Sequence, residues 1–146
     1  MERVPNWLLS GKRCLMLYHR AAERHDDAKA DQRRIVVVGP CASGKSTLAI
    51  ALCQLGYNAH VCGQEHSVIA DLWQRAGPDV LIALEIDLPT LRWRRGGSWS
   101  AALYAAQRRR LAPAFAMADL VLDSGLLSKE MMVARVDAWL KRSASA

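Results

Sequence analysis

Short apolar runs alternate with amphipathic stretches over most of this chain. The runs are rich in β-branched and aliphatic residues, which is typical of buried strands. The predicted strands are 35–38, 59–62, 80–84 and 120–122. Apolar residues spaced three and four apart predict helices between them. The predicted helices are 45–55, 67–76, 87–95, 99–111 and 129–142. This alternation favours an α/β fold in which helices cover both faces of a parallel sheet.

Polar and conformationally special residues mark the ends of these elements. Ser67 and Ser128 are predicted to cap the helices that begin after them. Gly56 can close the first helix in a left-handed conformation. Pro113 has no backbone N–H, and the sequence therefore predicts that it lies just beyond the end of helix 99–111.

The chain divides into an N-terminal extension, residues 1–33, and a body, residues 34–146. The extension carries an apolar patch at 14–18, after which comes a run of charged and polar residues at 23–32. Such a run is typical of a solvated helix or linker. We expect the extension to be helical or partly disordered and the body to hold the function.

Composition narrows the class of protein. A chain of 146 residues with 51% hydrophobic and 23% charged residues has the make-up of one globular domain. No apolar run reaches the roughly 20 residues that span a bilayer, and no signal peptide is apparent at the start. The four cysteines form no CxxC pair, and cysteines and histidines show no zinc-site spacing. We expect a cytoplasmic protein with no membrane partner and no cysteine–histidine metal cluster.

The strongest motif lies between the first strand and the first helix. Residues 39–46 fit the phosphate-loop pattern G-x-x-x-x-G-K-[ST] at every fixed position. Gly39 and Gly44 allow backbone N–H groups to surround a phosphate, and Lys45 adds a cation. Ser46 offers a hydroxyl to Mg²⁺, and the helix adds its positive end. The residues predicted to bind the nucleotide are Gly39, Cys41, Ala42, Ser43, Gly44, Lys45, Ser46 and Thr47.

This strand, loop and helix resemble the P-loop NTPase superfamily, and residues 35–142 resemble its small-molecule kinases, such as the nucleoside monophosphate and shikimate kinases. The resemblance implies a three-layer α/β/α fold with a short, mostly parallel sheet of four to five strands. It also implies Mg·ATP as the phosphoryl donor. These kinases usually have a fifth strand beside the phosphate-loop strand, and the sequence supplies four.

The resemblance also assigns candidate roles to arginines. Residues 79–95 are similar to the late strand of these kinases and to the helix that leads into their lid. An arginine near the end of that helix contacts the transferring phosphoryl group, and Arg94 or Arg95 holds the matching place. Residues 95–99 would then form the lid. The second arginine cluster, 108–110, is either a solvated helix face or a further contact to phosphate.

Phosphoryl transfer also needs an acid that holds Mg²⁺ or accepts a proton. Glu65 lies just after the second strand, and ligands in parallel sheets bind beyond the carboxyl ends of strands. Glu65 is therefore a candidate for the base and, with Ser46, for the Mg²⁺ site. Glu85 and Asp87 lie at the end of the third strand and compete for the metal role, with helix capping as the alternative.

Three neighbours of Glu65 have two interpretations each. His66 could bind substrate or move a proton, although a lone surface histidine usually does neither. Asp71 could point into an acceptor pocket or to solvent. Trp73 is expected in the core, with a pocket wall as the alternative.

These features favour an ATP-dependent phosphotransferase that acts on a small molecule such as a nucleotide or hydroxylated metabolite. The alternative is a nucleotide-binding regulatory or interaction protein with little turnover. The net charge of +6 would also fit nucleic acid, but no nucleic-acid-binding motif is apparent, and we do not expect it as the main partner. The acceptor, the choice between ATP and GTP, and the oligomeric state stay open.

Overall fold

A computed structural model describes residues 31–146 of the chain, so all but the last three residues of the predicted extension lie outside the described part. The elements are β1 (Arg34–Val38), α2 (Lys45–Gln54), β2 (Asn58–Val61), the 3₁₀ turn η1 (Gln64–His66), α3 (Leu72–Arg75), β3 (Val80–Glu85), α4 (Leu88–Arg95), α5 (Ala101–Met117), β4 (Leu120–Asp123) and α6 (Lys129–Ala144). Each predicted strand matches an observed strand to within one residue at either end.

Within the described residues the sheet has four strands in the order β2-β1-β3-β4. Every neighbouring pair is parallel, with Ile35 of β1 opposite Ala59 of β2 and opposite Val80 of β3. The predicted α/β class and parallel pairing are confirmed. Because β2 and β3 occupy both sides of β1, no further strand lies beside β1. All four carboxyl ends meet at one edge of the sheet.

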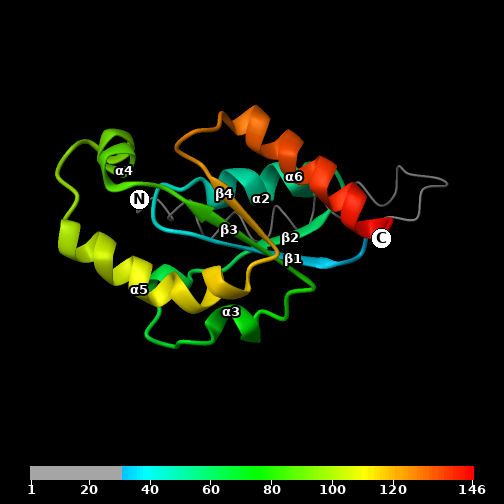
Figure 1. The fold of residues 1–146 in the computed structure, drawn as a ribbon, viewed down its shortest axis with the longest axis horizontal. Coiled ribbons are helices and arrows are strands. Elements are labelled where there is room, and N and C mark those ends of the chain that lie inside the picture. Colours follow the sequence, from blue (N-terminus) through cyan, green and yellow to red (C-terminus); the bar gives the residue numbers. More distant parts are fainter. Residues whose placement is uncertain (1–30) are drawn as a thin grey trace, which may run out of the picture.

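Helices cover both faces of this sheet, with α2 and α6 on one side and α3 and α5 on the other (Figure 1). Alternate residues of β1 serve the two cores. Ile35 and Val37 pack on the side of α2 and α6, whereas Val36 and Val38 pack on the side of α5. Burial on both faces explains why β1 is a continuous apolar run rather than an alternating one.

At three helix ends, the residues that the sequence marks as caps or terminators are found in that role. The Ser128 hydroxyl accepts a hydrogen bond from the Met131 N–H at 3.2 Å, which confirms the predicted start of α6. Asp87 accepts from the Thr90 N–H at 2.8 Å and begins α4. Gly56 lies just after α2 with φ at +95°, a conformation that glycine adopts without strain.

The predicted helix at 67–76 is wrong for most of its length, because α3 is a single turn, Leu72–Arg75. A buried glutamine causes the difference. The Gln64 side chain donates to the Ile69 carbonyl at 2.8 Å and accepts from the Trp73 N–H at 3.0 Å. These two bonds hold the chain in a loop, and Ser67 bonds locally to the Ile69 N–H rather than capping a helix. Val68, which lies within the predicted helix, is 89% exposed.

The predicted end of the helix before Pro113 is also wrong, because α5 runs through this residue to Met117. Pro113 is exposed, whereas Leu111 and Ala114 are buried against the sheet. Burial of these neighbours offsets the backbone hydrogen bond that proline cannot make. No helix within residues 31–146 is both long and apolar enough to cross a membrane.

Candidate functional site

The 39–46 loop connects the end of β1 to the start of α2. Gly44 adopts φ of +90° and Ala42 φ of +61°, so the backbone turns sharply before the helix. Gly39 is tightly enclosed, since a Cβ there would lie 2.6 Å from the Leu84 carbonyl oxygen and 2.7 Å from the Ser43 hydroxyl. The two glycines are therefore required for different reasons, Gly44 by its backbone conformation and Gly39 by the close approach of β3.

Lys45 is buried beneath this loop with three acceptors around its ammonium group. Nζ donates to the carbonyl oxygens of Gly39 at 2.8 Å and Pro40 at 3.1 Å. Nζ also forms an ion pair with Oε1 of Glu65 at 2.8 Å. An ammonium group has three N–H donors, and these three oxygens match them. A phosphate oxygen can therefore reach Lys45 only by taking the place of one of them.

Glu65 lies on η1 and is only 3% exposed. Its Oε1 binds Lys45, whereas its Oε2 is buried and has no partner among the described residues. Arg110 of α5 donates to the Glu65 backbone carbonyl at 3.1 Å and holds the turn in place. Because buried polar atoms are nearly always hydrogen-bonded, the free oxygen of Glu65 is where a ligand or bound water is expected.

A cavity of about 900 Å³ opens between the loop, β2 and α4. Its lining residues are Cys41, Ala42, Gly44, Lys45, Ser46, Thr47, Ala49, Ile50, Ala59, His60, Val61, Gly63, Glu65, His66 and Arg95. Of the predicted binding residues, Ser43 is fully buried and Gly39 does not line the cavity. Ser46 and Glu65, the predicted metal pair, both line it.

Arg94 and Arg95 of α4 make different contacts. Arg95 lines the cavity, and its guanidinium lies 5.6 Å from the centre of the Trp99 ring. Arg94 instead binds backbone, donating to the carbonyl oxygens of Ala42 at 2.8 Å and Ser124 at 2.7 Å. Arg94 thus ties the 39–46 loop to the loop after β4, and of the two candidates Arg95 is the one at the cavity.

The second arginine cluster lies away from this cavity. Arg108 donates to the Tyr104 hydroxyl at 3.1 Å and lies 3.5 Å from Glu85 Oε1. Arg109 lines a separate pocket of about 280 Å³ that contains no residue of the 39–46 loop. Arg110 supports the backbone of Glu65.

The acids after β3 take no part in the cavity lining. Asp87 caps α4, and the hydrogen bonds from Thr90 hold the pKa of Asp87 below its ordinary value. The structure thus shows the capping alternative for this residue. Glu85 is partly exposed and faces Arg108 across the surface.

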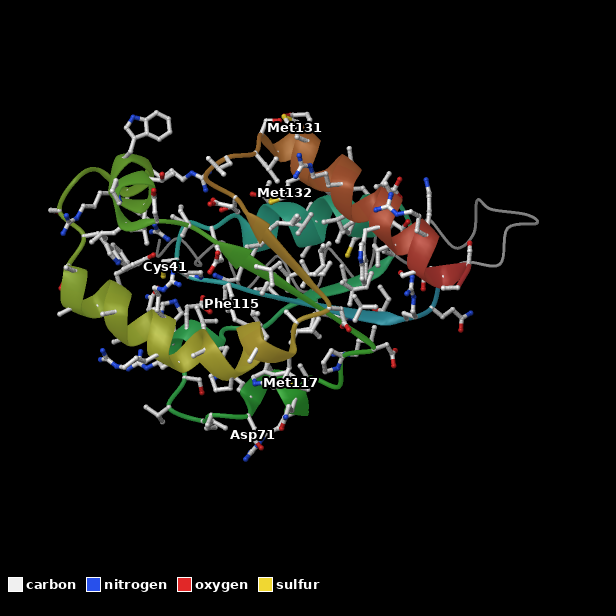
Figure 2. The ribbon with its side chains drawn as sticks, viewed as in Figure 1. Cys41, Asp71, Phe115, Met117, Met131 and Met132 are labelled. Carbon is white, nitrogen blue, oxygen red and sulfur yellow. The ribbon has the colours of Figure 1, made fainter. Side chains whose placement is uncertain are left out.

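For Asp71 and Trp73 the structure selects one of the two interpretations. Asp71 pairs with Arg75 one helical turn later, at 3.1 Å. Figure 2 shows Asp71 on the outer side of the molecule, far from Cys41 in the loop. Trp73 is buried in the core beside α5, as expected.

The structure brings one cysteine and one histidine together, a proximity that their spacing in the sequence does not predict. The Cys41 Sγ lies 3.4 Å from the His66 Nε2, which in turn lies 3.5 Å from the Glu65 Oε1. The three donor atoms all lie within 4.8 Å of one another. Sequence spacing could not indicate this group, because Cys41 and His66 come from loops after different strands that meet at the same sheet edge.

Two residues of the site carry no motif and were missed from the sequence. Gln107 of α5 is fully buried, accepts from the Cys41 N–H at 3.1 Å and donates to its Sγ at 3.2 Å. The one sequence signal that could have identified Gln107 is a polar residue on the buried face of a helix. His60 lines the cavity from β2, where burial lowers the pKa of its imidazole, as does the nearby charge of Arg34.

No protein-family model matches the chain, and no curated protein matches it.

Proposed function

We propose that this chain is a P-loop NTPase that binds Mg·ATP at the 39–46 loop and transfers a phosphoryl group to a small molecule. The observation that carries the proposal is the joint placement of the loop, the buried Lys45 and Glu65 at one cavity. A cavity of about 900 Å³ lies within the range of small-molecule sites.

Phosphate binding is supported by the charges and amides at this edge of the sheet. The start of α2, a helix of ten residues, presents its positive end at the loop. Ser46 and Thr47 occupy its first turn and are exposed at the cavity. A triphosphate would accept from loop N–H groups while one of its oxygens replaces the Glu65 carboxylate at Lys45.

That replacement would give Glu65 its function. Once separated from Lys45, the buried carboxylate can accept the proton of an acceptor hydroxyl or hold a water bound to Mg²⁺. Its unpartnered Oε2 and the exposed Ser46 hydroxyl are hard oxygen donors, which fits Mg²⁺. Bound Mg²⁺ would neutralise charge that develops on the phosphate oxygens.

The arginines of α4 complete the proposed site. Arg95, which lines the cavity, would contact the transferring phosphoryl group. Arg94 acts as a positioning residue, since it holds the Ala42 carbonyl and so the shape of the loop. The reaction then depends on placement and charge stabilisation.

A nucleotide-binding regulatory protein with little turnover is the second candidate. The Lys45–Glu65 ion pair favours it, because the pair occupies both groups that a phosphotransferase needs. The four-stranded sheet of residues 31–146 also has no further strand beside β1 to bring a second acid to the loop.

ADP release from Mg·ATP, measured against a panel of nucleotides, sugars and other alcohols, tests both candidates. The variant Glu65→Gln is compared with Glu85→Gln, the same change at the carboxylate outside the cavity. We expect acceptor-dependent release that falls about 10²–10⁴-fold in Glu65→Gln and is unchanged in Glu85→Gln. Lys45→Met combined with Glu65→Gln serves as the blank.

The other outcomes distinguish the candidates. ATP binding without release for any acceptor would support the regulatory protein. Release stimulated by RNA or DNA rather than by a small acceptor would contradict the proposed substrate class. Failure to bind ATP would overturn both candidates.

A further inference from the structure

We propose that Cys41, Glu65 and His66 form a Zn²⁺ site at the wall of the cavity. The three side chains contribute a sulfur, an oxygen and a nitrogen donor from two loops that meet beside the sheet. This site shares Glu65 and Cys41 with the proposed Mg·ATP site, but its donor atoms are present without nucleotide, and the inference does not rest on ATP binding.

The spacing of the donor atoms fits a tetrahedral ion. With Zn–S of about 2.3 Å and Zn–N and Zn–O of about 2.0–2.1 Å, tetrahedral angles place sulfur about 3.5 Å from nitrogen and nitrogen about 3.4 Å from oxygen. The structure has 3.4 Å between Cys41 Sγ and His66 Nε2, and 3.5 Å between His66 Nε2 and Glu65 Oε1. Two edges of the coordination tetrahedron are thus already in place.

The kinds of donor atom select the metal. Thiolate and imidazole favour zinc and related transition metals, whereas Mg²⁺ and Ca²⁺ take oxygen donors. Three protein ligands leave the fourth position of a zinc ion for water or another ligand. Since Cys41, Glu65 and His66 all line the cavity, that position would be reached from it.

The surroundings hold two of the ligands in position. Gln107 binds both the backbone N–H and the sulfur of Cys41, and Arg110 binds the backbone carbonyl of Glu65. Such outer contacts orient metal ligands and are characteristic of built sites. Glu65 Oε1 also pairs with Lys45 at 2.8 Å, whereas the buried Oε2 has no partner among residues 31–146, so the carboxylate has a second oxygen for a cation.

Cobalt(II) is the probe of choice, because it takes the place of zinc and gains a charge-transfer absorption when a thiolate binds it. We expect the full-length chain to bind one Co²⁺ with this absorption, and added Zn²⁺ to displace it. Cys41→Ser should remove the absorption. His66→Gln, a change at an exposed side chain, should weaken binding of both metals by more than about 100-fold, beyond the 10–100-fold that outer contacts contribute.

Cys62→Ser is the matched control. Cys62 is also a buried free thiol, but it lies outside the donor group, and burial raises its pKa. We expect this variant to keep the absorption and the affinity. The proposal is overturned if the native chain does not bind Zn²⁺, if bound Co²⁺ shows no thiolate absorption, or if Cys41→Ser and His66→Gln bind as tightly as Cys62→Ser. These titrations contain no nucleotide, so their failure is distinct from failure to bind ATP.

Discussion

Carboxylates lie after both β2 and β3 at the same edge of the sheet, yet their surroundings differ. Glu65, after β2, is 3% exposed and paired with a buried lysine at 2.8 Å. Glu85, at the end of β3, is partly exposed and 3.5 Å from an exposed arginine, and Asp87 caps a helix. An acid at the end of a parallel strand is therefore a candidate by its position, and burial with an unpartnered oxygen is what distinguishes Glu65 as the acid proposed to bind a ligand.

The path of the chain beyond each strand causes this difference. After β2 the chain turns at once through η1, where Gln64 and Glu65 are both buried, and the carboxylate lies beneath the 39–46 loop. After β3 the chain enters α4, and Asp87 is used to start that helix. Glu65, which follows β2, therefore lies at the cavity, whereas Glu85 and Asp87 at the end of β3 lie outside its lining.

The largest expected effect is on the buried pair. Lys45→Ala leaves the Glu65 carboxylate buried without its partner, and we expect a loss of about 3–5 kcal/mol in the free energy of unfolding. Arg108→Ala, which removes the partner of Glu85, should cost less than about 1 kcal/mol. Urea unfolding curves of the two variants measure the contrast.

A double variant tests whether the loss of stability in Lys45→Ala comes from the unpaired buried charge of Glu65. Lys45→Met with Glu65→Gln removes both charges, and we expect it to recover most of the stability lost in Lys45→Ala. If Lys45→Ala and Arg108→Ala prove equally stable, the two acidic sites do not differ as described.

A smaller effect is expected at Asp87. Asp87→Ala removes the side chain that accepts from the Thr90 N–H, and the melting temperature should fall by a few degrees. Asp87→Asn keeps an acceptor at the same place and should melt close to the native chain. ATP affinity should be unchanged in both, because Asp87 lies outside the cavity lining. Loss of affinity in Asp87→Asn would assign this residue to the site after all.

Low pH should remove the helix cap that Asp87 provides. Because the folded pKa of Asp87 lies below the unfolded value of about 3.9, its contribution to stability is complete above that value and is lost as the pH falls through the folded pKa. Thermal melts should therefore show the native chain losing stability relative to Asp87→Asn below about pH 4. A constant difference between the two across this acid range would contradict the capping role.

The smallest effect is expected for Glu85→Gln. This carboxylate is partly exposed, so we expect a change in unfolding free energy within about 0.5 kcal/mol that shrinks further in high salt. Chemical denaturation at low and high ionic strength measures it. A cost above about 2 kcal/mol would show that Glu85 does more than pair at the surface.

The features that could be predicted are those that depend on residues close together in the sequence. The four strands, their parallel arrangement and the capped starts of α4 and α6 could be predicted from apolar runs and from Asp87 and Ser128. The 39–46 loop is recognisable by its glycines because a close approach at Gly39 and a positive φ at Gly44 leave little choice of residue.

The features that the sequence did not predict depend on contacts between distant residues. Gln64 binds two backbone groups several positions later and prevents the helix that the pattern favoured. Burial of Leu111 and Ala114 carries α5 through Pro113. Cys41 and His66 meet only because β1 and β2 are adjacent and parallel.

The most direct test is a calorimetric titration with Mg·ATP. We expect the native chain and Glu85→Gln to bind one nucleotide with equal affinity. The double variant Lys45→Met with Glu65→Gln should bind about 10- to 100-fold more weakly, because it lacks a charged hydrogen bond to phosphate. No binding to the native chain, or equal binding to all three proteins, would contradict a nucleotide site at the 39–46 loop.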